Sequence, residues 1–206
     1  MSAPQGSPEW LQERAGKVTA SGISNVIAKG RGNEPSATRA KYMGQLIAET
    51  LTGQPAKTFT NAAMEHGTEH EPMARARYEI AFGVMVEQVG LILHPKIDRA
   101  GASPDGLVDE EGLLEIKCPE THTHIEYLLA NTVPTVYRPQ MAWQCACTGR
   151  KWVDFVSFDP RMPEELQLFA VRYVPDEKYL SELEGAVIGF LAEMDMKLEE
   201  LRKVAA

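Results

Sequence analysis

Two short runs with apolar residues near the middle of the chain are separated by an acidic segment. Residues 102–108 end in Leu-Val, residues 113–118 begin Leu-Leu-Glu-Ile, and the segment 109–112 between them ends in glycine. A polar turn that ends in glycine between two such runs predicts a β-hairpin. Because side chains alternate along a strand, Glu115 and Lys117 are expected on one face of this hairpin, with an apolar surface on the other.

Apolar residues at helical spacing mark much of the remaining chain. Ser7 and Ser36 are expected to cap helices, and Gly53 is expected to end one. Pro72 lies inside a long helical stretch and predicts a kink or a restart near Glu71. The expected helices are 8–16, 19–27, 36–52, a stretch capped by Asn61 that continues to about 82, 122–130, 139–148, and a long helix from about 175.

The strand-like segments and the last helix complete the predicted fold. Strands are expected at 84–86, 91–93, 152–158 and 166–174, and a mobile Gly-rich loop at 29–35. The last helix is expected to pack on the domain or on another subunit through Leu180, Leu183, Val187, Ile188, Leu191, Met194, Leu198 and Leu201. With no repeat or linker, these elements predict one α/β domain over residues 1–206, with a central mixed sheet of about five strands flanked by helices.

The composition is that of an ordinary globular protein, since 44% of the 206 residues are hydrophobic and 24% are charged. No run approaches the roughly 20 apolar residues of a membrane helix and no signal-peptide pattern is present, so a cytoplasmic location without membrane contact is expected. The three cysteines fit neither a disulfide framework nor a zinc pattern and are expected to be reduced and buried. The net charge of −8 argues against a simple nucleic-acid binder, although a groove can be basic in an acidic protein.

The hairpin carries the strongest candidate chemistry. Asp105 and Glu115 are hard oxygen ligands of the kind that holds Mg²⁺, and Lys117 could orient a water or add positive charge beside them. Two carboxylates and a lysine on one face therefore suggest phosphodiester hydrolysis. The alternative is a surface hairpin with an exposed glutamate and lysine two residues apart, which contributes little to stability.

Arg14 and Ser21 allow two interpretations. Arg14 lies near the end of the first helix, where a solvated arginine is common and favourable to the helix dipole. With Ser21 and the free N–H groups of the second helix, it could instead form an anion pocket.

Polar residues on two later helices are also ambiguous. Gln140 and Gln144 are four residues apart and share a helical face, where two exposed polar residues are the commoner case. His122 and His124 are two apart and do not share a helical face, so a loop or solvent-facing role is expected for both.

A competing motif lies in the helix that contains Pro72. The segment His66-Gly67-Thr68-Glu69-His70 matches the His-x-x-Glu-His zinc signature, with His66 and His70 as ligands and Glu69 as general base. Gly67 and the nearby Pro72 weaken the rigid helix that such a site needs. A zinc peptidase is therefore retained only as an alternative.

Several motifs together carry a family resemblance. Ser103-Pro-Asp105-Gly and Glu115-Ile-Lys117 resemble the PD-(D/E)XK nuclease motif. Three further matches are similar to the phage lambda exonuclease family of viral recombination nucleases, and they occur in the family's order between about residues 8 and 158: Trp10-x-x-x-Arg14-x-Gly-x-x-Thr-Ala-Ser21, Gly67-x-x-x-Glu71, and Gln140 on the helix after the hairpin.

The resemblance implies a restriction-endonuclease-like fold and a 5′→3′ exonuclease that digests one strand of linear double-stranded DNA in phage-type recombination. It also implies two Mg²⁺ ions, for which Mn²⁺ could substitute, a ring-shaped homotrimer, and a single-strand annealing recombinase as partner. A structure-specific or restriction-type endonuclease on the same fold is the main alternative. A DNA-binding scaffold without catalysis is disfavoured because Asp105 and Glu115 are both present.

The resemblance also implies a role for each matched residue. The metal ligands would be Asp105, Glu115, the carbonyl of Ile116, and Glu71. Lys117 would position the attacking water, and Gln140 would support that lysine or the water. Arg14, Ser21 and Ser103 match the family's pocket for a 5′-phosphate.

Overall fold

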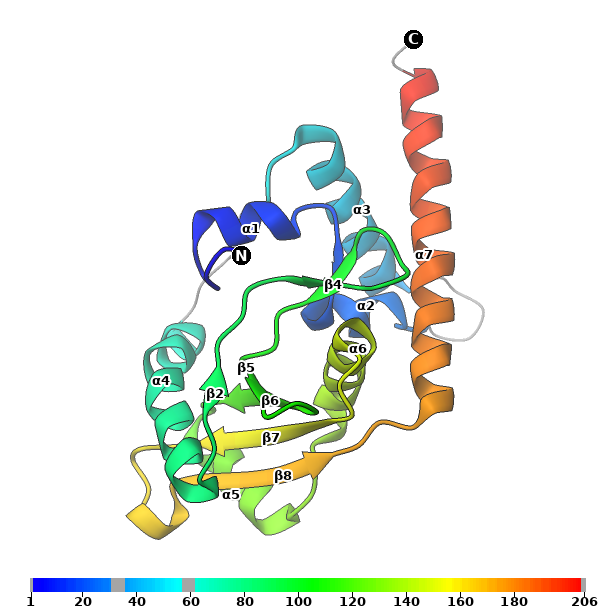
Figure 1. Cartoon of the computed structure of the whole chain (residues 1–206). Helices are drawn as coiled ribbons and strands as arrows, with labels where there is room; N and C mark the ends of the chain where they lie inside the picture. Colours follow the sequence, from blue (N-terminus) through cyan, green and yellow to red (C-terminus); the bar gives the residue numbers. More distant parts are fainter. Residues whose placement is uncertain (1, 31–35, 57–61, 205–206) are drawn as a thin grey trace.

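A mixed five-stranded sheet lies in the lower half of the molecule as drawn in Figure 1. The structure is a computed structural model that describes residues 2–30, 36–56 and 62–204, and the five strands are those found within these residues. Its strand order is β2 (Val86–Glu87), β5 (Gly106–Val108), β6 (Gly112–Lys117), β7 (Trp152–Phe158) and β8 (Leu168–Tyr173). β6 and β7 are parallel and the other neighbours are antiparallel, so the predicted mixed sheet and the β5–β6 hairpin are both confirmed.

A smaller sheet interrupts the first predicted hairpin strand. Its order is β1 (Val18–Thr19), β4 (Ala100–Ala102) and β3 (Ile92–Leu93). The prediction of a single strand over 102–108 is wrong, because the chain pairs with β1 and β3 up to Ala102 and enters the main sheet only at Gly106. The break leaves Asp105 at the junction between the two sheets.

The helix boundaries follow the caps expected from the sequence. Ser7 and Ser36 each accept a hydrogen bond from the backbone N–H three residues on, and Gly53 and Gly149 end their helices in the left-handed conformation. The α-helices are α1 (Pro8–Arg14), α2 (Ile23–Val26), α3 (Ala37–Thr52), α4 (Ala62–Phe82), α5 (Thr121–Ala130), α6 (Arg138–Thr148) and α7 (Glu177–Val204). Short 3-10 turns are η1 (Ala20–Gly22), η2 (Thr135–Tyr137) and η3 (Glu164–Leu166).

Helices cover both faces of the main sheet. One apolar cluster joins α4 to alternate residues of β6 and β7, and another joins α5 and α6 to the residues between them. β7 is therefore buried on both faces, as the nearly continuous apolar character of 152–158 predicted. This arrangement places β6, which carries Glu115 and Lys117, between α4 and α6.

α4 runs without a break through Pro72, so the helix does not restart near Glu71, and the kink that was the other predicted outcome stays a prediction. Proline removes one backbone hydrogen bond from a helix interior. Packing offsets that loss, because Ala74 and Tyr78 are buried against the sheet and the Tyr78 hydroxyl donates to Asp154 Oδ2 at 2.7 Å. The predicted Asn61 cap and residues 31–35 of the predicted mobile loop lie outside the described residues.

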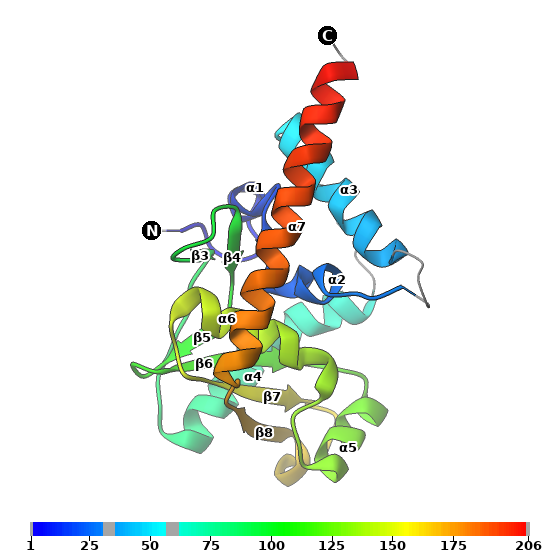
Figure 2. The ribbon, with the colours of Figure 1, turned by 90° about the vertical axis from the view of Figure 1, so that its right-hand side faces the viewer.

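α7 packs against α2, α3 and α6 and extends past them at its C-terminal end (Figure 2). The prediction that it packs on the domain is confirmed for the buried Leu183, Val187, Leu191, Met194 and Leu198 and for the partly buried Leu180. Ile188 and Leu201 are 55% and 45% exposed, so these two residues do not pack on the domain. Ile188 is one helical position past Val187 and turns away from the core, whereas Phe190, which was not among the predicted packing residues, is buried in it.

Two further predictions concern the cysteines and the membrane. Cys118, Cys145 and Cys147 are free and buried, as expected. Across the described ranges, no helix combines the length and the apolar character needed to span a membrane.

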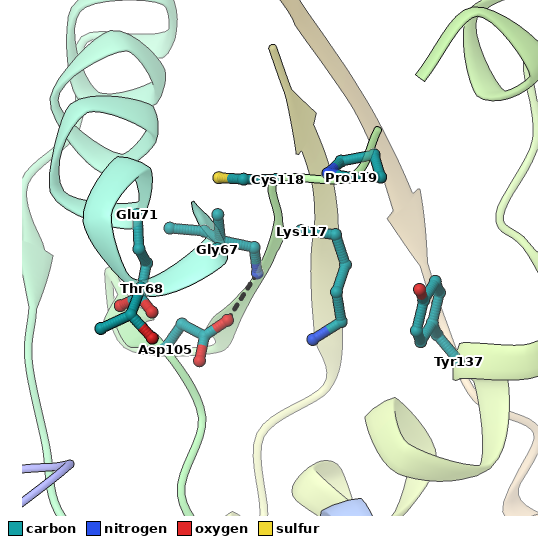
Figure 3. Close-up of a pocket in the computed structure, with 9 residues that line it drawn as sticks. Gly67, Thr68, Glu71, Asp105, Lys117, Cys118, Pro119 and Tyr137 are labelled. Carbon is teal, nitrogen blue, oxygen red and sulfur yellow. Dashed lines mark hydrogen bonds between the residues drawn. The ribbon is translucent and has the colours of Figure 1, made fainter. Parts of the chain in front are cut away.

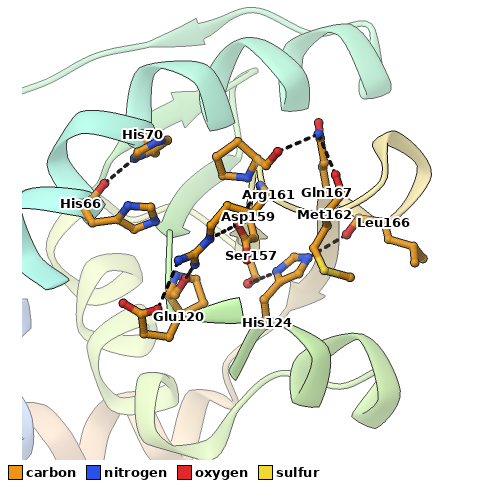
Figure 4. Close-up of polar contacts among 12 residues, drawn as sticks. His66, His70, Glu120, His124, Ser157, Asp159, Arg161, Met162, Leu166 and Gln167 are labelled. Carbon is orange, nitrogen blue, oxygen red and sulfur yellow. Dashed lines mark hydrogen bonds and ion pairs between the residues drawn. The ribbon is translucent and has the colours of Figure 1, made fainter. Parts of the chain in front are cut away.

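α5 buries a histidine where the sequence suggested a solvent-facing one. His124 has no exposed surface, and its Nδ1 and Nε2 lie 2.7 Å from Ser157 Oγ and 2.8 Å from the Leu166 carbonyl (Figure 4). Because a carbonyl only accepts, Nε2 donates to Leu166, and Nδ1 shares a hydrogen bond with the Ser157 hydroxyl, which can donate or accept. The predicted loop or solvent role is wrong for His124, whereas His122 is exposed as expected.

Replacing His124 with alanine should lower the free energy of unfolding by roughly 2–4 kcal/mol, because it leaves a cavity and two buried polar groups without partners. Urea denaturation monitored by circular dichroism measures the change. His122→Ala is the matched control on the same helix and should stay within about 0.5 kcal/mol of the wild type. Equal effects of the two substitutions would contradict the structural role assigned to His124.

Candidate active site

A pocket of about 360 Å³ lies between α4 and the end of β6. Figure 3 shows Glu71 and Asp105 on one side of this pocket, Tyr137 on the other, and the Lys117 amine between them. Four of the residues expected at the site, Glu71, Asp105, Ile116 and Lys117, therefore line one cavity. The complete lining is Gly67, Thr68, Glu71, Asp105, Ile116, Lys117, Cys118, Pro119 and Tyr137.

Asp105 is held against β6 by two backbone contacts. Its N–H donates to the Leu114 carbonyl at 3.1 Å, and its Oδ2 accepts from the Ile116 N–H at 2.6 Å. The break between the two sheets therefore places this carboxylate beside the strand that carries Glu115. The expected proximity of Asp105 to that strand is confirmed.

Glu115 is fully buried between β6 and α6 and accepts hydrogen bonds on both oxygens. Lys117 Nζ and Gln140 Nε2 donate to Oε1 at 2.5 and 2.6 Å, and Gln144 Nε2 donates to Oε2 at 2.5 Å. A buried carboxylate needs such partners because its loss of hydration is otherwise costly. This geometry contradicts both the exposed surface hairpin and the reading of Gln140 and Gln144 as two exposed residues.

The pocket concentrates negative charge around one lysine. Burial raises the pKa of Asp105 well above its ordinary value, and the Glu115 and Glu71 carboxylates raise it further. Burial also raises the pKa of Glu71, although Arg75, which donates to Glu71 Oε1 at 2.6 Å, opposes this shift. Burial lowers the pKa of Lys117, but the Glu115 and Asp105 carboxylates outweigh it and leave the pKa above its usual value.

The residues around the pocket fit a hard divalent cation by their chemistry. The Glu115 carboxylate raises the pKa of both Glu71 and Asp105, Glu71 raises that of Asp105 as well, and a bound cation would relieve this repulsion. As the side chains stand in the described residues, no three His, Cys, Asp or Glu groups converge to hold a metal ion. Three N–H donors occupy three of the roughly four lone-pair sites of the Glu115 carboxylate, which leaves one site for a cation.

A second pocket of about 420 Å³ surrounds Arg14 between α1, η1 and α3. Arg14 Nη2 donates to Ser21 Oγ at 3.0 Å and to Thr19 Oγ1 at 3.3 Å, and its guanidinium lies 4.1 Å from the centroid of the Trp10 ring. In the described part of the chain, no carboxylate forms an ion pair with Arg14, and burial lowers its pKa. A half-buried guanidinium with hydroxyl partners suits an anionic ligand.

Ser103 links this second pocket to the first. It lines neither of them, but its Oγ accepts a hydrogen bond from Trp10 Nε1 at 3.0 Å, and Asp105 follows two residues later. Arg14, Ser21 and Ser103 are therefore grouped around Trp10, with Ser103 on the side toward Asp105.

The zinc alternative lacks a ligand set. The His66 and His70 rings lie 4.1 Å apart, and His70 Nδ1 donates to the His66 carbonyl at 2.9 Å, which uses one of the nitrogens that a metal would need (Figure 4). Glu69 shares their helix, but within the described ranges no third histidine, cysteine or carboxylate completes a metal site with them.

Some residues of the two pockets were not singled out from the sequence. Tyr137 faces Lys117, with its ring centroid 5.3 Å from Nζ. Cys118 lines the same pocket, and burial is the largest cause that raises the pKa of its thiol to about 12. Glu49 is buried beside Arg14 and accepts from the Gly16 N–H at 2.8 Å. Cys118 could have been suspected from its position next to Lys117. Glu49 gave no signal, because it reads as one more polar residue on a helix.

The comparisons with known proteins agree with the motifs. Residues 9–151 match the model of the YqaJ-like viral recombinase domain. A search of curated protein sequences gave no match.

Solved structures extend the similarity over nearly the whole chain. The alkaline exonuclease LHK-Exo from Laribacter hongkongensis is 48% identical, with a TM-score of 0.89 over 97% of this chain and 98% of that one. The same enzyme in complex with dAMP has a TM-score of 0.90, at the same identity and coverage. A phage-related exonuclease from Haemophilus somnus is 15% identical and shares the fold, with a TM-score of 0.69 over 90% of this chain and 96% of that one.

These matches confirm the restriction-endonuclease-like fold expected from the motifs. They also confirm the family resemblance, because the family model covers well over half of the chain and LHK-Exo aligns with almost all of it. The chain belongs to the YqaJ-like viral recombinase family, among the lambda exonuclease-like proteins.

Proposed function

We propose that this chain is a metal-dependent DNA exonuclease that digests one strand of linear double-stranded DNA in the 5′→3′ direction. The observation that carries the proposal is the meeting of Glu71, Asp105 and Lys117 in one pocket, beside the buried carboxylate of Glu115. Similarity to the alkaline exonuclease LHK-Exo supports the same class of reaction.

The carboxylates and the Ile116 carbonyl would hold the metal. Glu71 and Asp105 line the pocket directly, and Glu115 stands behind them on β6. We propose that these groups hold two Mg²⁺ ions, or Mn²⁺ in their place, which when bound would supply a water of lowered pKa and would neutralise charge on the reacting phosphate.

Lys117 and Gln140 would prepare the attack. Lys117 donates to Glu115 while its side chain is still 28% exposed toward the pocket, so it can hold a water or a phosphate oxygen there. Gln140 donates to Glu115 Oε1, which refines the role expected from the resemblance: it supports the lysine through the shared carboxylate. The oxygen of water adds to phosphorus and the bond from phosphorus to the 3′ oxygen of the terminal nucleotide breaks, while a proton from the water ends on that 3′ oxygen, which leaves as a hydroxyl.

The pocket around Arg14 would recognise the end of the strand. Arg14 and Ser21 would hold the 5′-phosphate, with Ser103 reaching the same region through Trp10. Hydrolysis of the phosphodiester between the terminal nucleotide and the second one releases a nucleoside 5′-monophosphate, the chemical class of the dAMP bound to LHK-Exo. It also leaves a new 5′-phosphate on the shortened strand, so each turnover regenerates the group that Arg14 binds.

We also propose a ring-shaped homotrimer that encloses the duplex and passes the exposed strand to a single-strand annealing recombinase. Resemblance to the lambda exonuclease family supports both ideas. A closed ring would favour processive digestion, because the protein could dissociate only when DNA leaves the channel.

Digestion of matched DNA substrates tests the proposed activity. With Mg²⁺, a linear duplex should release mononucleotides from the 5′ end of one strand, EDTA should stop the reaction, and covalently closed circular DNA of the same sequence should remain intact. Substrates blocked at either the 5′ or the 3′ end report the direction. Cleavage of the closed circle would favour the endonuclease alternative, and no digestion with Mg²⁺ or Mn²⁺ would overturn the proposal.

A further inference from the structure

Gln144 lies in a fully buried position on α6, directly against the candidate active site. Its Nε2 donates to Glu115 Oε2 at 2.5 Å, and the residue has no exposed surface. The sequence gave it no role beyond sharing a helical face with Gln140. In the structure it is the partner of the Glu115 oxygen that neither Lys117 nor Gln140 contacts.

A buried glutamine at this position lowers stability, so the hydrogen bond to Glu115 is the contribution that would explain its presence. Its Oε1 is buried and has no hydrogen-bond partner among the described residues, and an unpaired buried carbonyl lowers stability. The neighbouring buried positions of α6 hold residues such as Met141 and Cys145, and an apolar side chain at 144 would avoid the penalty. Turning the amide would only place its oxygen against the carboxylate. The bond to Glu115 is therefore what this residue supplies.

Gln140 and Gln144 fix both oxygens of one carboxylate. They are one helical turn apart, so both side chains project from the same face of α6. Met141 and Cys145 bury the adjoining face of α6 against the apolar cluster that contains β6 and β7 residues. The helix is thus a rigid support, and the pair of amides sets the plane in which Glu115 lies.

We propose that Gln144 is a positioning residue that orients Glu115 for metal binding. This inference rests on the proposed nuclease function. Residues that hydrogen-bond a ligating carboxylate orient it, and their loss typically weakens metal affinity or activity by about 10- to 100-fold. Gln144 acts only through Glu115, because it does not line the pocket.

Direct Mn²⁺ titration of the full-length protein tests the proposal. The electron paramagnetic resonance signal of free aqueous Mn²⁺ measures binding without any catalysis. Gln144→Leu, which keeps the volume and removes the donor, should weaken Mn²⁺ binding by about 10- to 100-fold. Cys145→Ala is the matched control, since Cys145 is buried on the same helix and does not contact Glu115, and it should bind Mn²⁺ as the wild type does.

Nuclease rates supply a second measurement. Raising the Mn²⁺ concentration should restore much of the rate of Gln144→Leu, because the side chain positions a ligand and does not touch the substrate. Gln144→Met repeats the test with an unbranched side chain should leucine disturb the packing. Failure of both variants to fold, with the control folded, would mean a structural role and overturn the proposal.

The outcomes separate this inference from the function it depends on. If Gln144→Leu folds and binds Mn²⁺ as tightly as the wild type, or if Cys145→Ala weakens binding equally, the positioning role is wrong and the nuclease stands. If the wild type neither binds Mn²⁺ nor digests DNA, the proposed function fails first and the positioning role with it.

Discussion

Replacing Lys117 with methionine is expected to slow digestion of linear duplex DNA by about 10³-fold, the range lost when a positioned catalytic group is removed. Methionine keeps most of the length of the side chain but removes its charge and its donors. Because the Glu115 and Asp105 carboxylates hold the pKa of Lys117 above its usual value, the amine is protonated at neutral pH. It therefore orients water or neutralises phosphate charge and does not take up a proton.

A single-turnover assay with saturating Mg²⁺ measures this loss, and thermal denaturation checks that the variant is folded. Lys151→Met is the matched control, because Lys151 is 69% exposed and pairs only with Glu111 on the surface in the described structure. It should digest DNA at the wild-type rate. Full activity in Lys117→Met would show that the lysine has no part in the mechanism and would argue against this pocket as the active site.

The regular parts of the fold could be predicted because local rules decide them. Ser36 and Gly53 delimit α3 through capping and a left-handed turn, and these signals need no knowledge of the tertiary structure. The strand over 152–158 was recognisable because a strand buried on both faces is apolar at almost every position. Glu115 and Lys117 were placed on a common face by strand alternation alone, and their side chains do meet.

The remaining parts depend on partners that are distant in the sequence. The break at 103–105 was not predicted because it depends on the pairing of β4 with β1 and β3, and both of these strands are too short to give a recognisable sequence pattern. His124 was assigned to solvent because its partners, Ser157 and Leu166, come from β7 and η3. Gln144 was passed over for the same reason: a glutamine on a helix looks exposed until a buried carboxylate is found beside it.

Resemblance and structure contribute differently to the site. The family motifs nominated Arg14, Ser21 and Ser103 as a group, although spacing alone favoured a solvated arginine. The structure shows why they can act together, since the Trp10 ring lies against Arg14 and its Nε1 donates to Ser103. Metal ligation by Glu71, Asp105 and Glu115 stays a prediction, because the chemistry fits while the side chains do not yet converge.

Replacing Arg14 with glutamine should reduce the preference for a 5′-phosphorylated end over a 5′-hydroxyl end by about 10- to 100-fold, which corresponds to the loss of one or two charge-assisted hydrogen bonds. Arg14 already aligns its guanidinium with Ser21 and against Trp10, so a phosphate entering this pocket would meet a preorganised donor. Initial rates on two linear duplexes that differ only in the terminal phosphate measure the preference. Arg14→Lys should retain part of this preference, because the lysine ammonium keeps the charge but lacks the paired N–H donors of the planar guanidinium.

The comparison of ends separates recognition from cutting. Arg14→Gln should digest the 5′-hydroxyl duplex at nearly the wild-type rate, since Arg14 lies outside the pocket that contains Lys117. Lys117→Met should instead slow digestion of both duplexes by the same factor. Arg77→Gln, which removes a surface arginine paired with Glu164, should change neither rate. An unchanged preference in a folded and active Arg14→Gln would place the 5′-phosphate elsewhere. The carboxylate pocket would then have to select the strand end without help from α1 and η1.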